Sequence, residues 1–423
     1  MDGILLIQTF LAKALFYSKS RSSFYEDRQI KVDNKYGLIT MNTRNIHSIE
    51  ARATSDNSYY QIQDDSNTLI AMVEDMSSSD KIYQPTNYWA PYCESILNSL
   101  RQHGLHNIRR RDPKLFGTFG ATDVAPRFQS PDCYSGDSSN YEVYLAVVGA
   151  LNTIWEAGGP VGPDWTTLSD YFDMCRIVAD ANGTRSGVKV ASSIGFSRYG
   201  NPLGFDDQGL FCSFNALYYY HFACFAARSV GLKEADTVVE IGSGYGGQAE
   251  VLKALFPDLT IVLLDLAPQL YVAERFLSAT FPDAVIPYKN TRPSSWDGKL
   301  TPGHIHFLSP CDIERLAPTG RVLFWNSASF GEMEPETVIN YGRNVSRFAH
   351  SLYLMQYFSG KPPNQAGAGG VLVSSDMAVY EAAFSDFQRT TTEKAVRANG
   401  LSILQEGNPP APYLSTAWVR RDG

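Results

Sequence analysis

The chain has 423 residues and a mass of 46.9 kDa, which is enough for two or three domains of ordinary size. Hydrophobic residues make up 44% and charged residues 19%, a balance typical of a large buried core that excludes a globally disordered chain. The net charge is −8, which argues against a general nucleic-acid-binding surface. We therefore expect a soluble globular protein.

Six cysteines are scattered along the chain without any C-x-x-C spacing. That distribution argues against a disulfide scaffold or a structural zinc site and is typical of reduced thiols in the cytoplasm. The apolar opening, residues 3–13, lacks a basic leader and a small-residue cleavage site, and Gln8 and Lys13 interrupt it well short of a membrane span. The sequence predicts a docking or dimer-forming helix there, and a cytoplasmic protein without a membrane segment.

The first 200 residues carry few regular patterns. Residues 36–41 are typical of a strand, and residues 88–105 have apolar side chains at helical spacing. The basic run Arg109-Arg110-Arg111 follows, and it has two interpretations: a solvated helix end with salt-bridge partners, which is favoured, or a phosphate-binding site. Residues 117–139 are rich in Gly, Pro, Asp and Ser and predict a long irregular connection.

From residue 201 onward, helical segments alternate with short apolar runs. Helices are predicted at residues 214–230, 247–256, 269–281 and 336–348. Runs of strand length lie at residues 238–241, 261–264, 305–308, 322–325 and 352–355. Strands separated by helices require right-handed crossovers and a mostly parallel sheet that is covered on both faces. Residues 401–404 and 414–419 are expected to add an antiparallel pair at the edge of this sheet.

The strongest local pattern is the glycine-rich segment 240–247, E-I-G-S-G-Y-G-G, between a predicted strand and a predicted helix. Glycines permit a tight turn with positive φ and let a ligand approach bare backbone. The free N–H groups of the following helix favour an anionic group. The next strand ends in Asp265, whose carboxylate can accept both hydroxyls of a ribose. The pattern therefore predicts a site for a nucleoside-like ligand.

Glu240 discriminates between two cofactors. The spacing Gly242-x-Gly244-x-x-Gly247 also fits the dinucleotide fingerprint, with Asp265 near the usual distance. An acid two residues before the first glycine would repel a pyrophosphate, but it can orient an ammonium group. S-adenosylmethionine has an ammonium, a carboxylate, a ribose and no phosphate, so it is favoured over a nicotinamide dinucleotide. A strand–turn–helix without a ligand is the third interpretation.

Longer segments of the chain carry a family resemblance. The loop 240–247 and the segment 264–273, L-D-L-A-P-Q-L-Y-V-A, are similar to the cofactor site of class I methyltransferases, and more narrowly to that of the sugar O-methyltransferase family. Residues 326–333, N-S-A-S-F-G-E-M, resemble that family's fourth-strand motif, and residues 200–204 resemble its approach to the first strand. The sequence departs from the family at Ala267, where proline is expected. The resemblance covers roughly residues 200–360, and none is seen before residue 85.

The resemblance implies a Rossmann-like, doubly wound, seven-stranded class I methyltransferase domain of the α/β class over residues 201–423. A mainly helical and irregular N-terminal region, residues 1–200, would precede it and cover the acceptor site or mediate dimerisation. The implied cofactor is S-adenosyl-L-methionine, and Ser309-Pro310 would lie against its adenine ring. The residues expected to hold it are Glu240, Gly242, Ser243, Gly244, Gly246, Asp265, Leu266, Ser309, Pro310 and Asn326.

Methyl transfer from a sulfonium is an in-line displacement, so the protein has mainly to position an acceptor hydroxyl and take its proton. Glu332 is the first candidate for a base or a substrate acceptor of hydrogen bonds, and holding its own loop through backbone N–H groups is an equal alternative. Asn326 is expected to position the substrate or the methionine part of the cofactor. His221 is the leading histidine because tyrosines flank it on the helix 214–230.

We predict O-methylation of a sugar or of a polyhydroxylated or glycosylated metabolite in natural product biosynthesis. The alternatives are methylation of a non-sugar natural product at oxygen, nitrogen or carbon, a non-methylating protein that keeps the cofactor fold, and a nicotinamide oxidoreductase, which Glu240 disfavours. The Gly-rich segment 361–370 is either a mobile lid over the acceptor or a plain surface loop. No compact His/Asp/Glu spacing predicts a metal site. The expected partners are a small hydroxylated acceptor and a second copy of the chain, without nucleic acid or membrane.

Overall fold

The computed structural model describes residues 30–33, 38–41, 60–111, 113–120, 127–128, 176, 179–202, 204–207, 209–395, 398–399 and 413–421. The chain divides into two compact units: residues 1–56 with 136–174, and residues 57–135 with 175–423. The described part of the first unit is an antiparallel hairpin of β1 (Ile30–Asp33) and β2 (Leu38–Met41), which agrees with the strand predicted at 36–41. The division does not fall at residue 200, because residues 57–135 belong to the same unit as the sheet.

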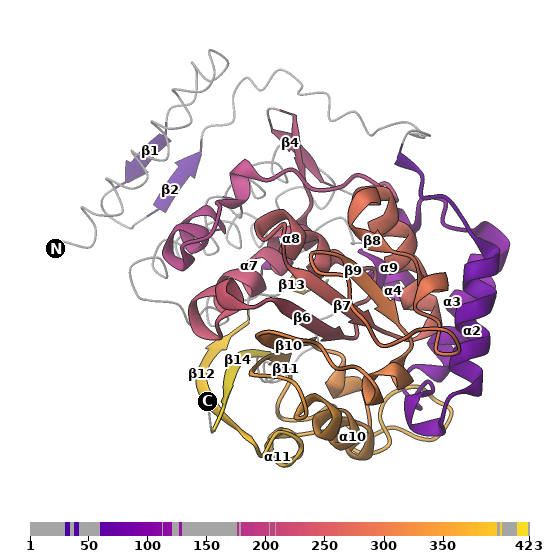
Figure 1. The fold of residues 1–423 in the computed structure, drawn as a ribbon. Coiled ribbons are helices and arrows are strands. Elements are labelled where there is room, and N and C mark those ends of the chain that lie inside the picture. Colours follow the sequence, from indigo (N-terminus) through magenta and orange to yellow (C-terminus); the bar gives the residue numbers. More distant parts are fainter. Residues whose placement is uncertain are drawn as a thin grey trace. The chain divides into compact units, whose positions relative to one another are not determined.

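An eight-stranded sheet forms the centre of the second unit (Figure 1). The strand order is β12-β14-β11-β10-β6-β7-β9-β8, in which the six strands from β11 to β8 run parallel and β14 runs antiparallel to both of its neighbours. The bounds are β6 (Thr237–Ile241), β7 (Thr260–Leu264), β8 (Val285–Ile286), β9 (Ile305–Leu308), β10 (Val322–Ser327), β11 (Ser351–Gln356), β12 (Phe387–Lys394) and β14 (Leu414–Arg420). Each of the five strands predicted between residues 238 and 355 is present.

The antiparallel edge differs in part from the prediction. Residues 414–419 form β14, as expected, but the partner predicted for it, residues 401–404, lies outside the described residues. β14 instead pairs with β11 and β12, with Ala417 opposite Tyr353 and Thr391. The sequence of β12, F-Q-R-T-T-T-E-K, is mostly polar because the strand is at the sheet edge and its alternate side chains are exposed. A search for apolar runs therefore does not find it.

Helices cover both faces of the sheet (Figure 1). On one face, Phe225 of α7 (Phe214–Ser229) packs against Tyr353 of β11, and α8 (Gly247–Leu255) lies beside α7. On the other face, α10 (Pro335–Val345) and α11 (Met377–Ala383) pack on Val239, Phe324 and Leu354. With α9 (Ala267–Thr280), all four helices predicted after residue 200 are present. The predicted doubly wound, Rossmann-like α/β fold is confirmed, with the two-residue strand β8 as an eighth strand.

Among the described residues, several helices precede α7 in the chain, of which α4 (Pro113–Phe116) has only four residues, and the two longest contact α9. α3 (Ala90–His103) is the helix predicted at residues 88–105. α2 (Ser66–Ser78) is not predicted, although Asp65 caps it by accepting a hydrogen bond from the N–H group of Thr68 (3.2 Å). The remaining short strands pair antiparallel: β4 (Phe205–Asp207) with β5 (Leu210–Cys212), and β3 (Arg127–Phe128) with β13 (Ala398–Asn399).

Residues 60–120 lie against the carboxyl ends of the central strands. The Ala267 N–H, just after β7, donates to Met76 Sδ (3.4 Å). The Thr86 hydroxyl donates to the Glu332 carbonyl (3.0 Å) in the loop after β10. The carbonyl oxygen of Thr118 lies 2.8 Å from where a Cβ atom on Gly244 would be, in the loop after β6. This part of the N-terminal half therefore covers the edge of the sheet where the predicted site residues lie.

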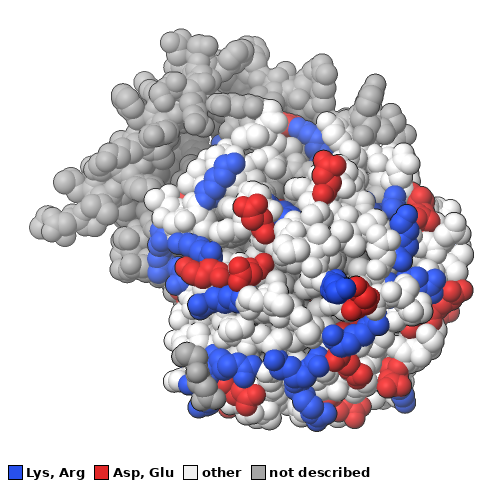
Figure 2. All heavy atoms as spheres, in the orientation of Figure 1, with Lys and Arg blue, Asp and Glu red and all other residues white. Residues whose placement is uncertain are grey.

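The described helices and the visible surface have two further properties. Among the described residues, every helix falls short of the length or the hydropathy that crossing a bilayer requires. On the face in Figure 2, basic and acidic side chains are interspersed with each other over the described part of the chain.

Candidate functional site

Two loops leave neighbouring strands at the point where the order of the sheet reverses. The chain continues from β6 to β7 on one side, whereas β10 lies on the other side, with Trp325 opposite Glu240. In open α/β sheets, ligands bind beyond the carboxyl ends of the strands at such a switch point. The glycine loop follows β6, and residues 328–333 follow β10, so the structure brings most of the predicted site residues to this edge.

The glycine loop has the backbone conformation that its sequence predicts. The φ angles of Gly242, Gly244 and Gly246 are 79°, 56° and 84°, all in the left-handed region that favours glycine. A Cβ atom on Gly242 would also lie 2.2 Å from the hydroxyl oxygen of Ser329. The loop is therefore enclosed by the chain that follows β10 as well as by Thr118.

Asp265 joins the ends of β6 and β7. Its Oδ2 accepts a hydrogen bond from the Gly244 N–H (2.8 Å), and its Oδ1 accepts one from the Leu266 N–H (2.7 Å). Burial raises the pKa of Asp265, and the Glu332 carboxylate adds to this rise, whereas the hydrogen bonds from the Gly244 and Leu266 N–H groups lower the pKa. The net result is a pKa of about 7. The side chain is partly exposed, and each oxygen keeps a lone pair for a ligand hydroxyl.

Two buried polar atoms beside this loop have no partner among the described residues. Glu240 is 2% exposed, and its Oε2 accepts no hydrogen bond from them. Burial, and then the charge of Asp265, raise the pKa of Glu240 well above its ordinary value. The Ser243 hydroxyl, in a residue that is 5% exposed, is also unpartnered. Because an unsatisfied buried polar group is costly, Glu240 Oε2 fits a ligand group that donates hydrogen bonds or carries positive charge, whereas the Ser243 hydroxyl can also donate to an anionic group.

Asn326 is fully used within the protein. Its side chain is 0% exposed, and its Nδ2 donates to the Ile241 carbonyl (2.8 Å) and to the Ser329 hydroxyl (2.7 Å). Its Oδ1 accepts from the Phe330 N–H (3.2 Å) and from the Gln356 amide. The Asn326 amide thus fixes the loop after β10 to the end of β6, and its contact with substrate or cofactor stays a prediction.

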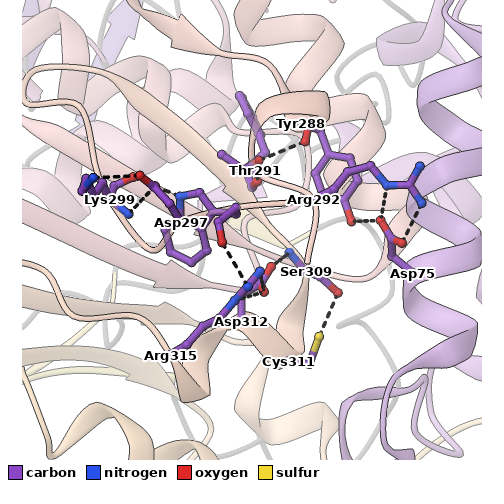
Figure 3. Close-up of polar contacts among 12 residues, drawn as sticks. Asp75, Tyr288, Thr291, Arg292, Asp297, Lys299, Ser309, Cys311, Asp312 and Arg315 are labelled. Carbon is purple, nitrogen blue, oxygen red and sulfur yellow. Dashed lines mark hydrogen bonds and ion pairs between the residues drawn. The ribbon is translucent and has the colours of Figure 1, made fainter. Parts of the chain in front are cut away.

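The turn after β9 is also rigidly held (Figure 3). Ser309 and Asp312 form a capping box, in which the Ser309 N–H donates to Asp312 Oδ2 (3.1 Å). Arg315 pairs with the same carboxylate (2.6 Å). Ser309 and Pro310 are buried at the carboxyl end of β9, next to β7, which is the position from which the predicted adenine contact would be made.

A second network in Figure 3 attaches α2 to this part of the sheet. Asp75 of α2 accepts two hydrogen bonds from the Arg292 guanidinium (2.9 and 2.8 Å) and one from the Tyr288 hydroxyl (2.9 Å). Arg292 and Tyr288 lie between β8 and β9. The bidentate pair fixes α2 beside the turn that carries Ser309. The sequence gives no signal for it, since the partners are more than 200 residues apart.

Glu332 is held by two side chains that the sequence analysis does not single out. Its Oε1 accepts from Lys361 Nζ (2.6 Å), and its Oε2 accepts from Trp89 Nε1 (3.1 Å). Burial alone would lower the pKa of Lys361, but the charge and hydrogen bond of Glu332, together with Tyr413 and Tyr88, outweigh it and the pKa is raised. Lys361 Nζ also lies 4.5 Å from the centroid of the Tyr88 ring. These contacts favour the loop-holding role of Glu332, through side chains instead of backbone N–H groups, and its role as a base stays a prediction.

The Gly-rich segment 361–370 is attached to the same N-terminal residues. Asn87 donates to the Gly370 carbonyl (2.8 Å), and its Oδ1 accepts from the Gly367 N–H (2.7 Å). Together with the Lys361–Glu332 pair, these bonds hold the segment against residues 86–92 in this conformation.

His221 is not brought together with Glu332 or Asn326. It is 3% exposed on α7, and its Nδ1 lies 2.9 Å from the amide nitrogen of Asn182. Burial, with the nearby Arg228 charge, lowers the pKa of His221 to about 3. None of its contacts in the described part of the chain reaches the glycine loop. The expectation that His221 leads the candidates for the base therefore lacks structural support, because the helix turns it toward residues 182 and 228.

The described residues include no group of three or more His, Cys, Asp or Glu side chains arranged to hold a metal ion.

No family model and no curated protein matches the chain. Among solved structures it is similar to the mitomycin 7-O-methyltransferase MmcR, with 15% identity over 78% of this chain and 98% of that one, at a TM-score of 0.30. It is also similar to EvdMO1 (14% identity, 52% of this chain, TM-score 0.30) and to the pyocyanin biosynthetic protein PhzM (12%, 48%, 0.30). The matches cover 44% of EvdMO1 and 56% of PhzM, so the chain spans about half the length of each.

The Glu332–Lys361 pair provides a test of the role of Glu332. We expect Glu332→Gln and Lys361→Met each to lower the free energy of unfolding by about 1–3 kcal/mol, between the values for exposed and fully buried pairs, because 18% and 21% of the two side chains are exposed. The double variant should lose less unfolding free energy than the sum of the two single losses, since the second change removes the charge that the first change leaves unpaired. Denaturant unfolding of the four proteins measures this coupling.

Lys299→Met is the matched control, since the Lys299–Asp297 pair is largely exposed and should contribute less than about 1 kcal/mol. A Glu332 that acts only as a base gives a different result. Glu332→Gln would then leave the unfolding free energy unchanged while turnover falls roughly 10²- to 10⁴-fold.

Proposed function

We propose that the chain is an S-adenosylmethionine-dependent O-methyltransferase that acts on a hydroxyl group of a small molecule. The observation that carries the proposal is the buried Glu240 carboxyl group, whose Oε2 is unpartnered among the described residues and which lies beside a glycine loop and a second acid, Asp265. A ligand with an ammonium group and a ribose, and without a phosphate, satisfies all three features.

Each part of this cofactor has a counterpart among the described residues. Glu240 would accept hydrogen bonds from its ammonium group, and Asp265 would accept them from the two ribose hydroxyls. The first N–H groups of α8 and the Ser243 hydroxyl would receive its carboxylate. Leu266, Ser309 and Pro310 lie at the ends of β7 and β9, where they would contact the adenine ring.

The remaining chemistry requires positioning and proton removal. S-adenosylmethionine supplies an electrophilic methyl group on its sulfonium. Residues 60–120 contact the chain at the carboxyl edge of the strands and would exclude water from it. The Glu332 carboxylate accepts two hydrogen bonds, and its oxygens keep lone pairs with which to orient an acceptor hydroxyl and take its proton.

The resemblance of the motifs favours a sugar or a polyhydroxylated or glycosylated metabolite as the acceptor, in a cytoplasmic enzyme of natural product biosynthesis. Two alternatives are a non-sugar natural product as acceptor and a chain that binds the cofactor without transferring a methyl group, and an acceptor screen decides between them. A homodimer built through the N-terminal region is a further proposal, which a mass measurement in solution decides.

The cofactor is tested directly by calorimetry and thermal shift with S-adenosylmethionine, S-adenosylhomocysteine and nicotinamide dinucleotides. We expect the first two ligands to bind and to raise the melting temperature, because a ligand that binds only the native state stabilises it. Binding of the dinucleotides alone would contradict the proposal. Formation of S-adenosylhomocysteine in the presence of hydroxylated acceptors then separates an enzyme from a chain that only binds.

Asp265→Ala should weaken the binding of S-adenosylhomocysteine by about 2–3 kcal/mol, as expected for two hydrogen bonds to a charged group. Calorimetry measures the affinity, and circular dichroism checks the fold, since Asp265 also holds the loops after β6 and β7. Asp297→Ala, at an exposed turn, is the control. Unchanged affinity in a folded Asp265→Ala protein would remove this residue from the site.

Cofactor affinity should rise with pH between about pH 6 and pH 8. In the free protein the pKa of Asp265 is about 7 and that of Glu240 is raised, so part of the population holds a proton on these groups at neutral pH. The ligand favours both carboxylates in their ionised form, so binding releases protons, and the affinity increases by up to about tenfold per pH unit for each proton released. Calorimetry in buffers of different ionisation enthalpy counts these protons. An affinity that falls over this range contradicts the assignment.

A further inference from the structure

Arg109 is buried against the centre of the glycine loop. It belongs to the basic run 109–111, for which a solvated helix end is favoured from sequence, yet its side chain is only 1% exposed. That interpretation is wrong for Arg109. Its Nη2 donates to the Tyr245 hydroxyl (3.1 Å), and its guanidinium carbon lies 4.6 Å from the centroid of the Tyr245 ring and 5.1 Å from that of Phe276.

The guanidinium is enclosed on its other sides. Its Nη1 donates to the carbonyl oxygens of Ser197 (3.2 Å) and Tyr199 (3.4 Å). A Cβ atom on Gly120 would lie 3.0 Å both from Arg109 Nε and from the Tyr245 ring. Because two aromatic faces and two carbonyl oxygens fix a planar group, both the position and the orientation of the cation are determined.

Tyr245 transmits this contact to the helix that follows the loop. Its hydroxyl oxygen lies 2.4 Å from where a Cβ atom on Gly247 would be, and Gly247 is the first residue of α8. The Arg109 guanidinium is therefore separated from the N-terminus of α8 by a single hydroxyl group. The tyrosine is 1% exposed and stands between two left-handed glycines, so its ring anchors the loop in the core.

The positive charge of Arg109 is not cancelled by a direct ion pair within the described residues. The carboxylate that interacts with it, Glu250 of α8, instead accepts a hydrogen bond from the Ser197 N–H (2.5 Å). Burial raises the pKa of Glu250 to about 7, against the opposing effect of Arg109, so Glu250 is only partly ionised at neutral pH. The Arg109 guanidinium is therefore a buried charge in a poorly screened environment, without a directly paired carboxylate in the described part of the chain.

We propose that Arg109 is a positioning residue for the amino-acid end of the cofactor, the part that carries its ammonium and carboxylate groups. It holds Tyr245, and with it the glycine loop, in one conformation, and it adds a buried positive charge at the N-terminus of α8, where the helix dipole already favours a carboxylate. This inference rests on the proposed function, since it concerns the S-adenosyl ligand of the same loop. It assigns part of that site to a residue more than 130 positions upstream of the loop.

Two ligands separate this role from a general effect on the fold. S-adenosylhomocysteine carries the amino-acid carboxylate, whereas 5′-methylthioadenosine has the same adenosine thioether without it. We expect Arg109→Met to weaken S-adenosylhomocysteine binding roughly 3- to 30-fold, the range of coupling through a packed network, and to change 5′-methylthioadenosine binding less than about twofold. Calorimetry on the full chain measures both affinities.

Two milder variants test the two parts of the proposal. Arg109→Lys keeps the charge but loses the planar contact with both rings, so it should restore part of the S-adenosylhomocysteine affinity. Tyr245→Phe keeps the ring and removes the hydroxyl, and it should weaken S-adenosylhomocysteine selectively. Arg110→Met is the matched control, because Arg110 belongs to the same basic run but is exposed. It should bind both ligands like the wild type.

The outcomes are distinguishable. Selective loss of S-adenosylhomocysteine affinity in the Arg109 variants supports the proposal. Equal losses of affinity for both ligands, or no loss for either, overturn it. If Arg109→Met does not fold, Arg109→Lys and Tyr245→Phe decide by the same comparison. A wild-type chain that binds neither ligand overturns the proposed function and this inference with it. If the wild type binds both ligands and the variants bind them as tightly as the wild type, only the inference is overturned.

Discussion

The hydrogen bond between the Gly244 N–H and the Asp265 carboxylate joins the loops that leave the two central parallel strands, and the geometry of the whole site depends on it. Parallel strands give no direct link between their carboxyl ends, so the loops there require side chains to fix them relative to one another. Asn326 does the same on the other side of β6, where its amide holds the Ile241 carbonyl and the Ser329 hydroxyl. Two side chains thus align three loops at the switch point of the sheet.

This arrangement leaves an electrostatic imbalance at the same place. Burial raises the pKa of both Glu240 and Asp265, and the charge of Asp265 raises that of Glu240 further. Behind the loop, Arg109 is a buried cation without a directly paired carboxylate among the described residues. Buried charges and unsatisfied polar atoms reduce stability, and their concentration at a ligand-binding edge is typical of a site prepared for a charged ligand with groups of both signs.

The N-terminal half contributes to this edge through several separate contacts. Met76 contacts the chain just after β7, and Trp89 contacts the loop after β10. In the glycine loop, Arg109 contacts Tyr245, and Thr118 lies against Gly244. Residues 57–135 therefore belong to the same compact unit as the sheet, and they cover the Glu332–Lys361 pair and the glycine loop. A low-dielectric environment strengthens every charge interaction at the site.

The sequence by itself determined the parallel sheet, its four flanking helices, the left-handed glycines and the acid at the end of β7. These features depend on local periodicity and on residue types that permit few backbone conformations, so they can be read without knowing the neighbours in space. Only the tertiary structure decided that the Asn326 amide bonds within the protein and that His221 contacts Asn182. It also decided that Glu332 pairs with Lys361 and Trp89, and that Arg109 is buried against Tyr245. Each of these involves at least one partner that lies 29 to 243 residues away along the chain. The physical reason is that polar side chains choose their partners by proximity after packing, which residue spacing does not encode.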